Sequence, residues 1–193
     1  MERSLIATGI GGQGIQLSAQ VMARAAIHDG RKAMLFGSYG GMMRGGSTDA
    51  SVVLADGPID SPPVLSRCWL GIAMHHQYLP GLLEKLDDRS TVFVNTSVIQ
   101  DKVDTAASVV DFGATELAVE AVSLVCATMV MVGAVAAATS LLSPEALEAG
   151  LAEALPPYRR EHFDLNTQAL AVGYDAGLEL AGSYTIPAAW ATR

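Results

Sequence analysis

Near its start the chain reads Leu5-Ile6-Ala7-Thr8-Gly9-Ile10-Gly11-Gly12-Gln13-Gly14, a short apolar run that breaks into a glycine turn. Helical periodicity follows from Gly14 to His28 and ends at Gly30. Glycines in such a turn allow a tight reversal, and the free amide groups at the following helix start favour an anion, commonly phosphate. The stretch predicts a strand, a turn and a helix, with candidate cofactor-binding residues at Gly9, Gly11, Gly12, Gln13 and Gly14.

Six short apolar runs, often β-branched, predict the strands of an α/β fold. They are residues 5–8, 33–36, 50–54, 69–73, 91–95 and 108–112. A strand, helix, strand order requires a crossover, which implies parallel pairing of the first two strands in a sheet covered by helices. We therefore expect a mostly parallel, Rossmann-like sheet.

The C-terminal third of the chain has a helical pattern. Ser143-Pro144-Glu145 predicts a helix start that Pro156-Pro157 brings to an end, and a last helix is expected over residues 165–180 with Asp164 as its cap. Periodicity is lost from Ser183 onward. We expect one domain over residues 1–182 and a C-terminal tail, residues 183–193, that is frayed or bound to a partner.

The segment from Val122 to Leu142 contains 21 residues without a charge, which is long enough to span a bilayer. It is rich in Ala, Thr, Ser and Gly, and no Lys or Arg lies between Lys102 and Arg159 to anchor an end. The composition favours a helix buried beneath other helices or a partner subunit, and no membrane partner is expected.

Charge and cysteine content exclude several classes of function. The 193 residues include 12 Lys+Arg and 20 Asp+Glu, a net charge of -8 that argues against a nucleic-acid partner. Cys68 and Cys126 are far apart and lack metal-ligand spacing, so this chain alone is not expected to hold an iron–sulfur cluster, a zinc ribbon or another metal site. Two free thiols and the lack of a basic, apolar leader predict a cytoplasmic protein.

The glycine turn leaves three interpretations open. Its Gly9, Gly11 and Gly14 match the G-x-G-x-x-G pattern of dinucleotide sites, but no acid lies between Asp29 and Asp49 to bind the ribose hydroxyls. The turn could hold a dinucleotide, hold another phosphate-bearing or anionic ligand, or be purely structural.

A second glycine-rich segment, Tyr39-Gly40-Gly41-Met42-Met43-Arg44-Gly45-Gly46, follows the second strand. The carboxyl ends of strands are where open α/β sheets bind ligands. The guanidinium of Arg44 can fork onto a carboxylate or phosphate, which makes it a further cofactor-binding candidate; alternatively it ties the loop to a neighbouring carbonyl or acid.

With both glycine segments in view, the sequence resembles the gamma subunit, or gamma domain, of the 2-oxoacid:ferredoxin oxidoreductases of the pyruvate and indolepyruvate type. Collinear features run from about Leu5 to Gly177. They are residues 9–14, 39–50, 56–62, 92–97, 129–134 and 142–147, with Asn166, Ala169, Gly173 and Tyr174.

The resemblance implies a three-layer α/β/α gamma-type domain in an enzyme that decarboxylates a 2-oxoacid on thiamine diphosphate and forms an acyl-CoA. Thiamine diphosphate, magnesium and iron–sulfur clusters are then expected on partners, namely alpha and beta type subunits and a ferredoxin-like domain or subunit. Coenzyme A is expected in the complex, and the resemblance associates Gly11, Gly12, Gln13, Gly14 and Arg44 with it. No residue of this chain is expected to be catalytic, and the chain alone is expected to be inactive.

The sequence departs from the family pattern at several positions. Gly41 and Met42 stand where relatives often have Pro and Glu, and Thr128 stands where they often have Asn. His75 and His76 form an unexpected pair whose side chains should point different ways and which favours no metal site. Two other functions stay open: a scaffold subunit whose glycine loops are hinges, and a free-standing reductase that uses a dinucleotide.

Overall fold

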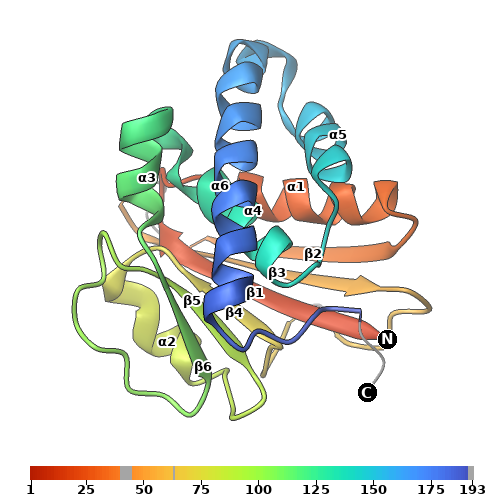
Figure 1. Cartoon of the computed structure of the whole chain (residues 1–193). Helices are drawn as coiled ribbons and strands as arrows, with labels where there is room; N and C mark the ends of the chain where they lie inside the picture. The colour runs from red at the N-terminus through yellow and green to blue at the C-terminus, as the bar shows by residue number, and fades with distance from the viewer. Residues whose placement is uncertain (40–44, 63, 191–193) are drawn as a thin grey trace.

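The computed structural model describes residues 1–39, 45–62 and 64–190, and its strands form one twisted sheet (Figure 1). All six predicted strands are confirmed, at or close to the expected positions. They are β1 (Glu2–Ile10), β2 (Lys32–Tyr39), β3 (Ser47–Ala55), β4 (Leu70–Ala73), β5 (Thr91–Asn95) and β6 (Ser108–Phe112).

The strand order β2-β3-β1-β4-β5-β6 corrects one prediction. β1 and β2 run in the same direction, but they do not pair, because β3 lies between them and is antiparallel to both. β3 therefore runs opposite to β2 and lies beside β1. The rest of the sheet is parallel, through β1 with β4, β4 with β5 and β5 with β6.

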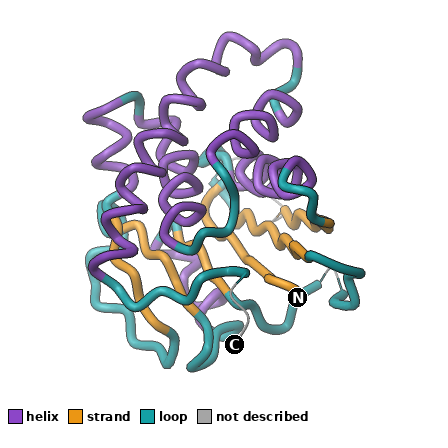
Figure 2. Tube along the Cα trace, turned by 45° about the vertical axis from the view of Figure 1, so that its right-hand side comes forward, coloured by secondary structure: helices purple, strands orange, loops and turns teal. Residues whose placement is uncertain are grey.

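Most helices cover one face of the sheet (Figures 1 and 2). They are α1 (Ile15–His28), α3 (Ala114–Ala121), α4 (Ala127–Ala138), α5 (Pro144–Ala154) and α6 (Phe163–Ser183). Strand residues alternate between the faces, so Leu5 and Ala7 pack beneath these helices while Ile6 points to the opposite side. This cluster is the larger of the two parts of the core.

The other face carries a thinner layer. The short helix α2 (Leu79–Leu83) packs there with loop residues after β3, β4 and β5. Leu82 and Leu86 meet Val92 and Val94 in a second apolar cluster. The expected α/β/α architecture with a helical C-terminal third is confirmed.

The charge-free segment forms the buried helix that its composition favours. A 3₁₀ turn, Leu124–Cys126, leads into α4, and all twelve residues of α4 are buried. In the ranges that the structure describes, no helix is long and apolar enough to cross a membrane.

The predicted start of α5 is confirmed and that of α6 is corrected. Ser143 caps α5, since its Oγ accepts from the backbone N–H of Ala146 at 3.2 Å. Asp164 does not cap α6: a 3₁₀ turn over Pro157–His162 runs straight into the helix, so Asp164 lies inside the first helical turn.

The C-terminal tail packs on its own chain as far as Trp190. The N–H of Ala189 donates to Thr139 O at 2.7 Å, and the indole Nε1 of Trp190 donates to Leu141 O at 2.8 Å. The guanidinium of Arg31 lies 4.2 Å from the centroid of the Trp190 ring. Over residues 184–190 the tail packs on its own chain, because the α4–α5 connection offers it carbonyl acceptors; the expected frayed or partner-bound tail and the domain boundary at residue 182 stay predictions.

Candidate ligand site at the carboxyl edge of the sheet

The glycine turn lies where the direction of chain winding changes. β1 leads into α1, on the main helical face, and its parallel neighbour β4 leads toward α2 on the other face. Such a point opens a crevice at the carboxyl ends of the two strands, and it is where open α/β folds bind ligands.

Two residues of the turn require glycine for their backbone conformation. Gly12 has φ +108° and Gly14 has φ +82°, both in the left-handed region. Gly14 immediately precedes α1, and among the described residues no side chain caps that helix. The first amide groups of α1 therefore face the crevice without a side-chain acceptor, which suits an anion.

Both polar atoms of the Gln13 side-chain amide form hydrogen bonds within the protein. Its Oε1 accepts from the N–H of Ile10 at 2.9 Å, and its Nε2 donates to Met74 O at 3.3 Å. The Thr128 hydroxyl donates to the backbone oxygen of Gln13. These bonds fasten the turn to β4 and to α4, so the side chain of Gln13 has a structural part that its expected ligand role did not include.

The two glycine segments lie in contact through their backbones. The N–H of Gly11 donates to Gly46 O at 2.9 Å, and that of Gly45 donates to Gly11 O at 3.4 Å. Gly45 has φ +75°. Arg44, together with residues 40–43, lies outside the described residues, so its expected ligand contact stays a prediction.

A hollow of about 300 Å³ opens beside the glycine turn. Its lining residues come from the ends of β4 and β5 and from the starts of α3 and α4. They are Gly12, Gln13, Met74, Val98, Thr115, Leu124, Val125, Ala127 and Thr128. Leu124 and Val125 are 59% and 75% exposed, so the turn that leads into α4 presents an apolar rim to the outside.

A hydrogen-bonded pair holds one wall of the hollow. Asn95, fully buried at the end of β5, donates from Nδ2 to Thr115 Oγ1 at 2.8 Å and accepts from Thr115 N at 3.2 Å. Val98 and Thr115 are not among the site residues expected from the sequence. Their positions directly after β5 and β6 could have revealed them, because parallel strands end at one edge.

His75 and His76 differ from expectation in their arrangement. Their rings stack, with centroids 4.3 Å apart, rather than pointing different ways. Burial and, secondarily, His76 lower the pKa of His75, which favours a neutral ring. Among the residues that the structure describes, no cluster of three His, Cys, Asp or Glu could hold a metal.

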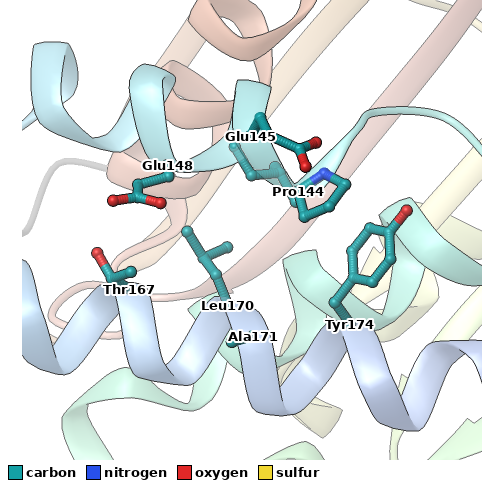
Figure 3. Close-up of a pocket in the computed structure, with 8 residues that line it drawn as sticks. Pro144, Glu145, Glu148, Thr167, Leu170, Ala171 and Tyr174 are labelled. Atoms are coloured by element: carbon teal, nitrogen blue, oxygen red, sulfur yellow. The ribbon is translucent and has the colours of Figure 1, made fainter.

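A second, smaller hollow lies between α5 and α6 (Figure 3). It measures about 160 Å³, and the side chains of Glu148 and Thr167 face each other across it. Thr167 Oγ1 is buried without a hydrogen-bond partner in the described part of the chain. Burial, then Glu145 and Asp29, raise the pKa of Tyr174 at its other end. Among the described residues, none of the predicted site residues lines this hollow.

Comparison with known proteins identifies the family. The family model for pyruvate ferredoxin/flavodoxin oxidoreductase matches residues 4–176. The chain belongs to this family. The resemblance inferred from the two glycine segments is confirmed, and the chain is a gamma-type subunit of a 2-oxoacid:ferredoxin oxidoreductase complex.

Archaeal oxidoreductase subunits are among its relatives. The 2-oxoglutarate synthase subunit KorC of Methanothermobacter marburgensis is 36% identical over 169 residues, which are 83% of this chain and 90% of that protein. The pyruvate synthase subunit PorC of Methanocaldococcus jannaschii is 27% identical over 181 residues, 90% of this chain and 96% of that protein.

Solved structures share the fold. A keto/oxoacid ferredoxin oxidoreductase gamma subunit from Geobacter sulfurreducens superposes with a TM-score of 0.79 at 26% identity, covering 93% of this chain and 98% of that one. The 2-oxoglutarate:ferredoxin oxidoreductase of Magnetococcus marinus, solved with 2-oxoglutarate, coenzyme A and succinyl-CoA, gives a TM-score of 0.81 at 16% identity. All of this chain matches 33% of that longer chain, so there the same fold is one part of a larger polypeptide.

Proposed function

We propose that this subunit supplies part of the coenzyme A site and active-site surroundings of a thiamine-diphosphate-dependent 2-oxoacid:ferredoxin oxidoreductase. The observation that carries the proposal is the joining of two glycine segments, through Gly11 with Gly45 and Gly46, beside an open hollow at the carboxyl edge. The enzyme containing this subunit converts a 2-oxoacid to an acyl-CoA.

The chemistry of the hollow suits the two ends of coenzyme A. Amide groups at the start of α1 and the guanidinium of Arg44 are donors of the kind that bind diphosphate. Val98, Leu124 and Val125 provide an apolar wall for a pantetheine arm. A ligand with one anionic and one mainly apolar part would use both halves of the site.

The remaining cofactors belong on partner subunits in this proposal. Cys68 and Cys126 are both buried, and burial raises the pKa of both thiols, that of Cys68 to about 12, so the protonated thiol is favoured at each. Alpha and beta type subunits would then carry thiamine diphosphate and magnesium, with iron–sulfur clusters there or on a ferredoxin-like domain or subunit.

Among 2-oxoacids, 2-oxoglutarate is the substrate that the relatives favour. Four proteins named 2-oxoglutarate synthase subunit KorC are 36%, 34%, 31% and 25% identical to this chain, against 27% for the pyruvate synthase and indolepyruvate oxidoreductase subunits. We therefore propose 2-oxoglutarate as the first acid to test with the assembled enzyme.

Coenzyme A titration of the assembled complex tests the proposal by calorimetry. Val125→Asp places a carboxylate on the rim of the hollow at a 75% exposed position, so the dissociation constant for coenzyme A should rise about tenfold while folding is retained. Val119→Asp is the matched control, because Val119 is 58% exposed on α3 and does not line the hollow. Arg44→Ala should weaken binding as well.

A scaffold function is the second candidate, and the internal bonding of Gln13 favours it. A scaffold predicts unchanged coenzyme A affinity in both Val125→Asp and Arg44→Ala, and it predicts that Val125→Asp impairs assembly. Co-purification with alpha and beta type subunits reads out assembly separately. The dinucleotide reductase that the turn left open predicts tight NADH binding by the isolated chain, which a fluorescence titration would reveal.

A further inference from the structure

A basic hollow lies at the amino edge of the sheet, opposite the glycine turn. Its volume is about 490 Å³. The start of β1, the residues just before β4 and β5, and the tail form its walls. Its lining residues are Arg3, Ser4, Arg67, Cys68, Trp69, Asp87, Arg89, Ser90, Pro187 and Ala188.

The net charge of this basic hollow is positive, whereas that of the whole chain is negative. Three guanidinium groups and one carboxylate line it, which leaves two positive charges, whereas the chain as a whole has a net charge of -8. A local excess of positive charge in an acidic protein concentrates anions at that place.

Arg67 and Arg89 share a single acceptor. Arg67 Nη1 and Arg89 Nη2 each lie 3.6 Å from the same atom, Asp87 Oδ2. Their side chains are 68% and 72% exposed. Each guanidinium has five N–H donors, so one carboxylate oxygen at this distance uses a small part of what the two arginines offer.

Arg3 and Asp87 are held in place by neighbouring groups. Arg3 Nε donates to Ala189 O, and its guanidinium lies 5.0 Å from the centroid of the Trp69 ring. The N–H of Arg89 donates to Asp87 Oδ1 at 3.0 Å, and this bond is the main reason that the pKa of Asp87 lies below its ordinary value. The floor of the hollow is therefore held by hydrogen bonds and a ring contact, and two exposed arginines lie at its mouth, each with most of its N–H groups left for a ligand.

We propose that the basic hollow binds a phosphate-bearing small molecule through Arg67 and Arg89, with diphosphate as the minimal ligand. A diphosphate offers enough oxygens to accept from both guanidinium forks at once, and its charge matches the local excess. The site is distinct from the glycine turn: Arg3 and Gly9 are six residues apart along β1, roughly 20 Å.

Calorimetric titration of the full chain with inorganic pyrophosphate at low salt tests the proposal. Arg67→Gln/Arg89→Gln should raise the dissociation constant about tenfold to a hundredfold, because two charge-assisted contacts are lost. Arg159→Gln/Arg160→Gln is the matched control: it removes the same charge from a 3₁₀ turn outside the hollow and should leave the affinity unchanged.

A third variant changes the affinity in the opposite direction. Asp87→Asn keeps an oxygen for the backbone N–H of Arg89 but removes the competing charge, so pyrophosphate should bind several-fold more tightly. This variant tests the site even if the double arginine variant fails to fold.

Three results would overturn the proposal. They are no pyrophosphate binding by the wild-type chain, equal weakening in the control pair, and no response to either the arginine or the Asp87 change. Loss of co-purification with partner subunits in Arg67→Gln/Arg89→Gln, without pyrophosphate binding by the wild type, would identify the surface as a protein contact instead.

Discussion

At the scale of single residues, Gln13 illustrates how a ligand candidate can be partly structural. Its side chain bridges Ile10 N and Met74 O, and its backbone oxygen accepts from Thr128. The G-x-G-x-x-G spacing predicts the glycine turn, but nothing in that spacing indicates these partners, which come from distant parts of the chain. The amide thus helps define the shape of the site without necessarily touching a ligand.

Replacing Gln13 by Ala should lower the free energy of unfolding by about 1–2 kcal/mol, because the turn loses both side-chain hydrogen bonds. Urea denaturation of the isolated chain measures this change. Gln168→Ala is the control, since its Nε2 makes one exposed bond to Ala121 O at 3.4 Å and its loss should cost under about 0.5 kcal/mol. Equal destabilisation by the two changes would contradict a stabilising role for the two side-chain hydrogen bonds of Gln13.

At the scale of elements, α4 and α6 approach more closely than ordinary side chains allow. A Cβ added to Gly173 would lie 2.0 Å from Val130 O, and one added to Gly133 would lie 2.2 Å from Leu170 O. The nearest atoms at these positions belong to the backbone of the facing helix. A side chain there could therefore be accommodated only if one helix moved away from the other. The glycines set the spacing of the helical layer that covers the sheet.

Gly173→Ala should therefore destabilise the chain by about 1–3 kcal/mol or more, despite the higher helix propensity of Ala. Gly182→Ala in the same helix has open space around it and should be neutral or stabilising by about 0.5–1 kcal/mol. Thermal denaturation of the two variants measures the difference. Similar melting temperatures would show that α4 and α6 can separate at little cost.

The elements and the mostly parallel sheet were predictable from sequence, and the antiparallel insertion of β3 was not. Apolar runs located the six strands, and Ser143 with Pro144 located the start of α5. The position of β3 between β1 and β2 was missed because hydrophobic periodicity reports which residues are buried and not the direction in which a strand runs. For the same reason, the contact between Gly11 and Gly46 could be seen only in the structure.

At the scale of the whole molecule, the C-terminal tail packs against the connection between α4 and α5. From the end of α6 it lines the basic hollow with Pro187 and Ala188, and it then reaches the α4–α5 connection, where Trp190 Nε1 donates to Leu141 O. Loss of periodicity at Ser183 correctly indicated the end of the helix but carried no information about where the tail would lie. Its packing depends on acceptors that α4 and its connection provide.

Trp190→Ala should lower the free energy of unfolding by about 1–3 kcal/mol, since it removes the indole bond and the contact with Arg31. Tyr158→Ala, at a 76% exposed aromatic residue, is the control and should change stability by less than about 0.5 kcal/mol. Chemical denaturation compares them. An unchanged midpoint for Trp190→Ala would mean that the tail adds nothing to the stability of the domain.

The insertion of β3 places the two glycine segments at the same end of the β1–β3 ladder. Paired residues run without interruption from Glu2 with Ala55 to Ile10 with Ser47, so this ladder reaches the start of the first glycine segment and the end of the second. A ligand that holds one segment would restrain the other through the last rung of this ladder. Slower amide exchange at Gly11 and along the beginning of β3 would report that restraint.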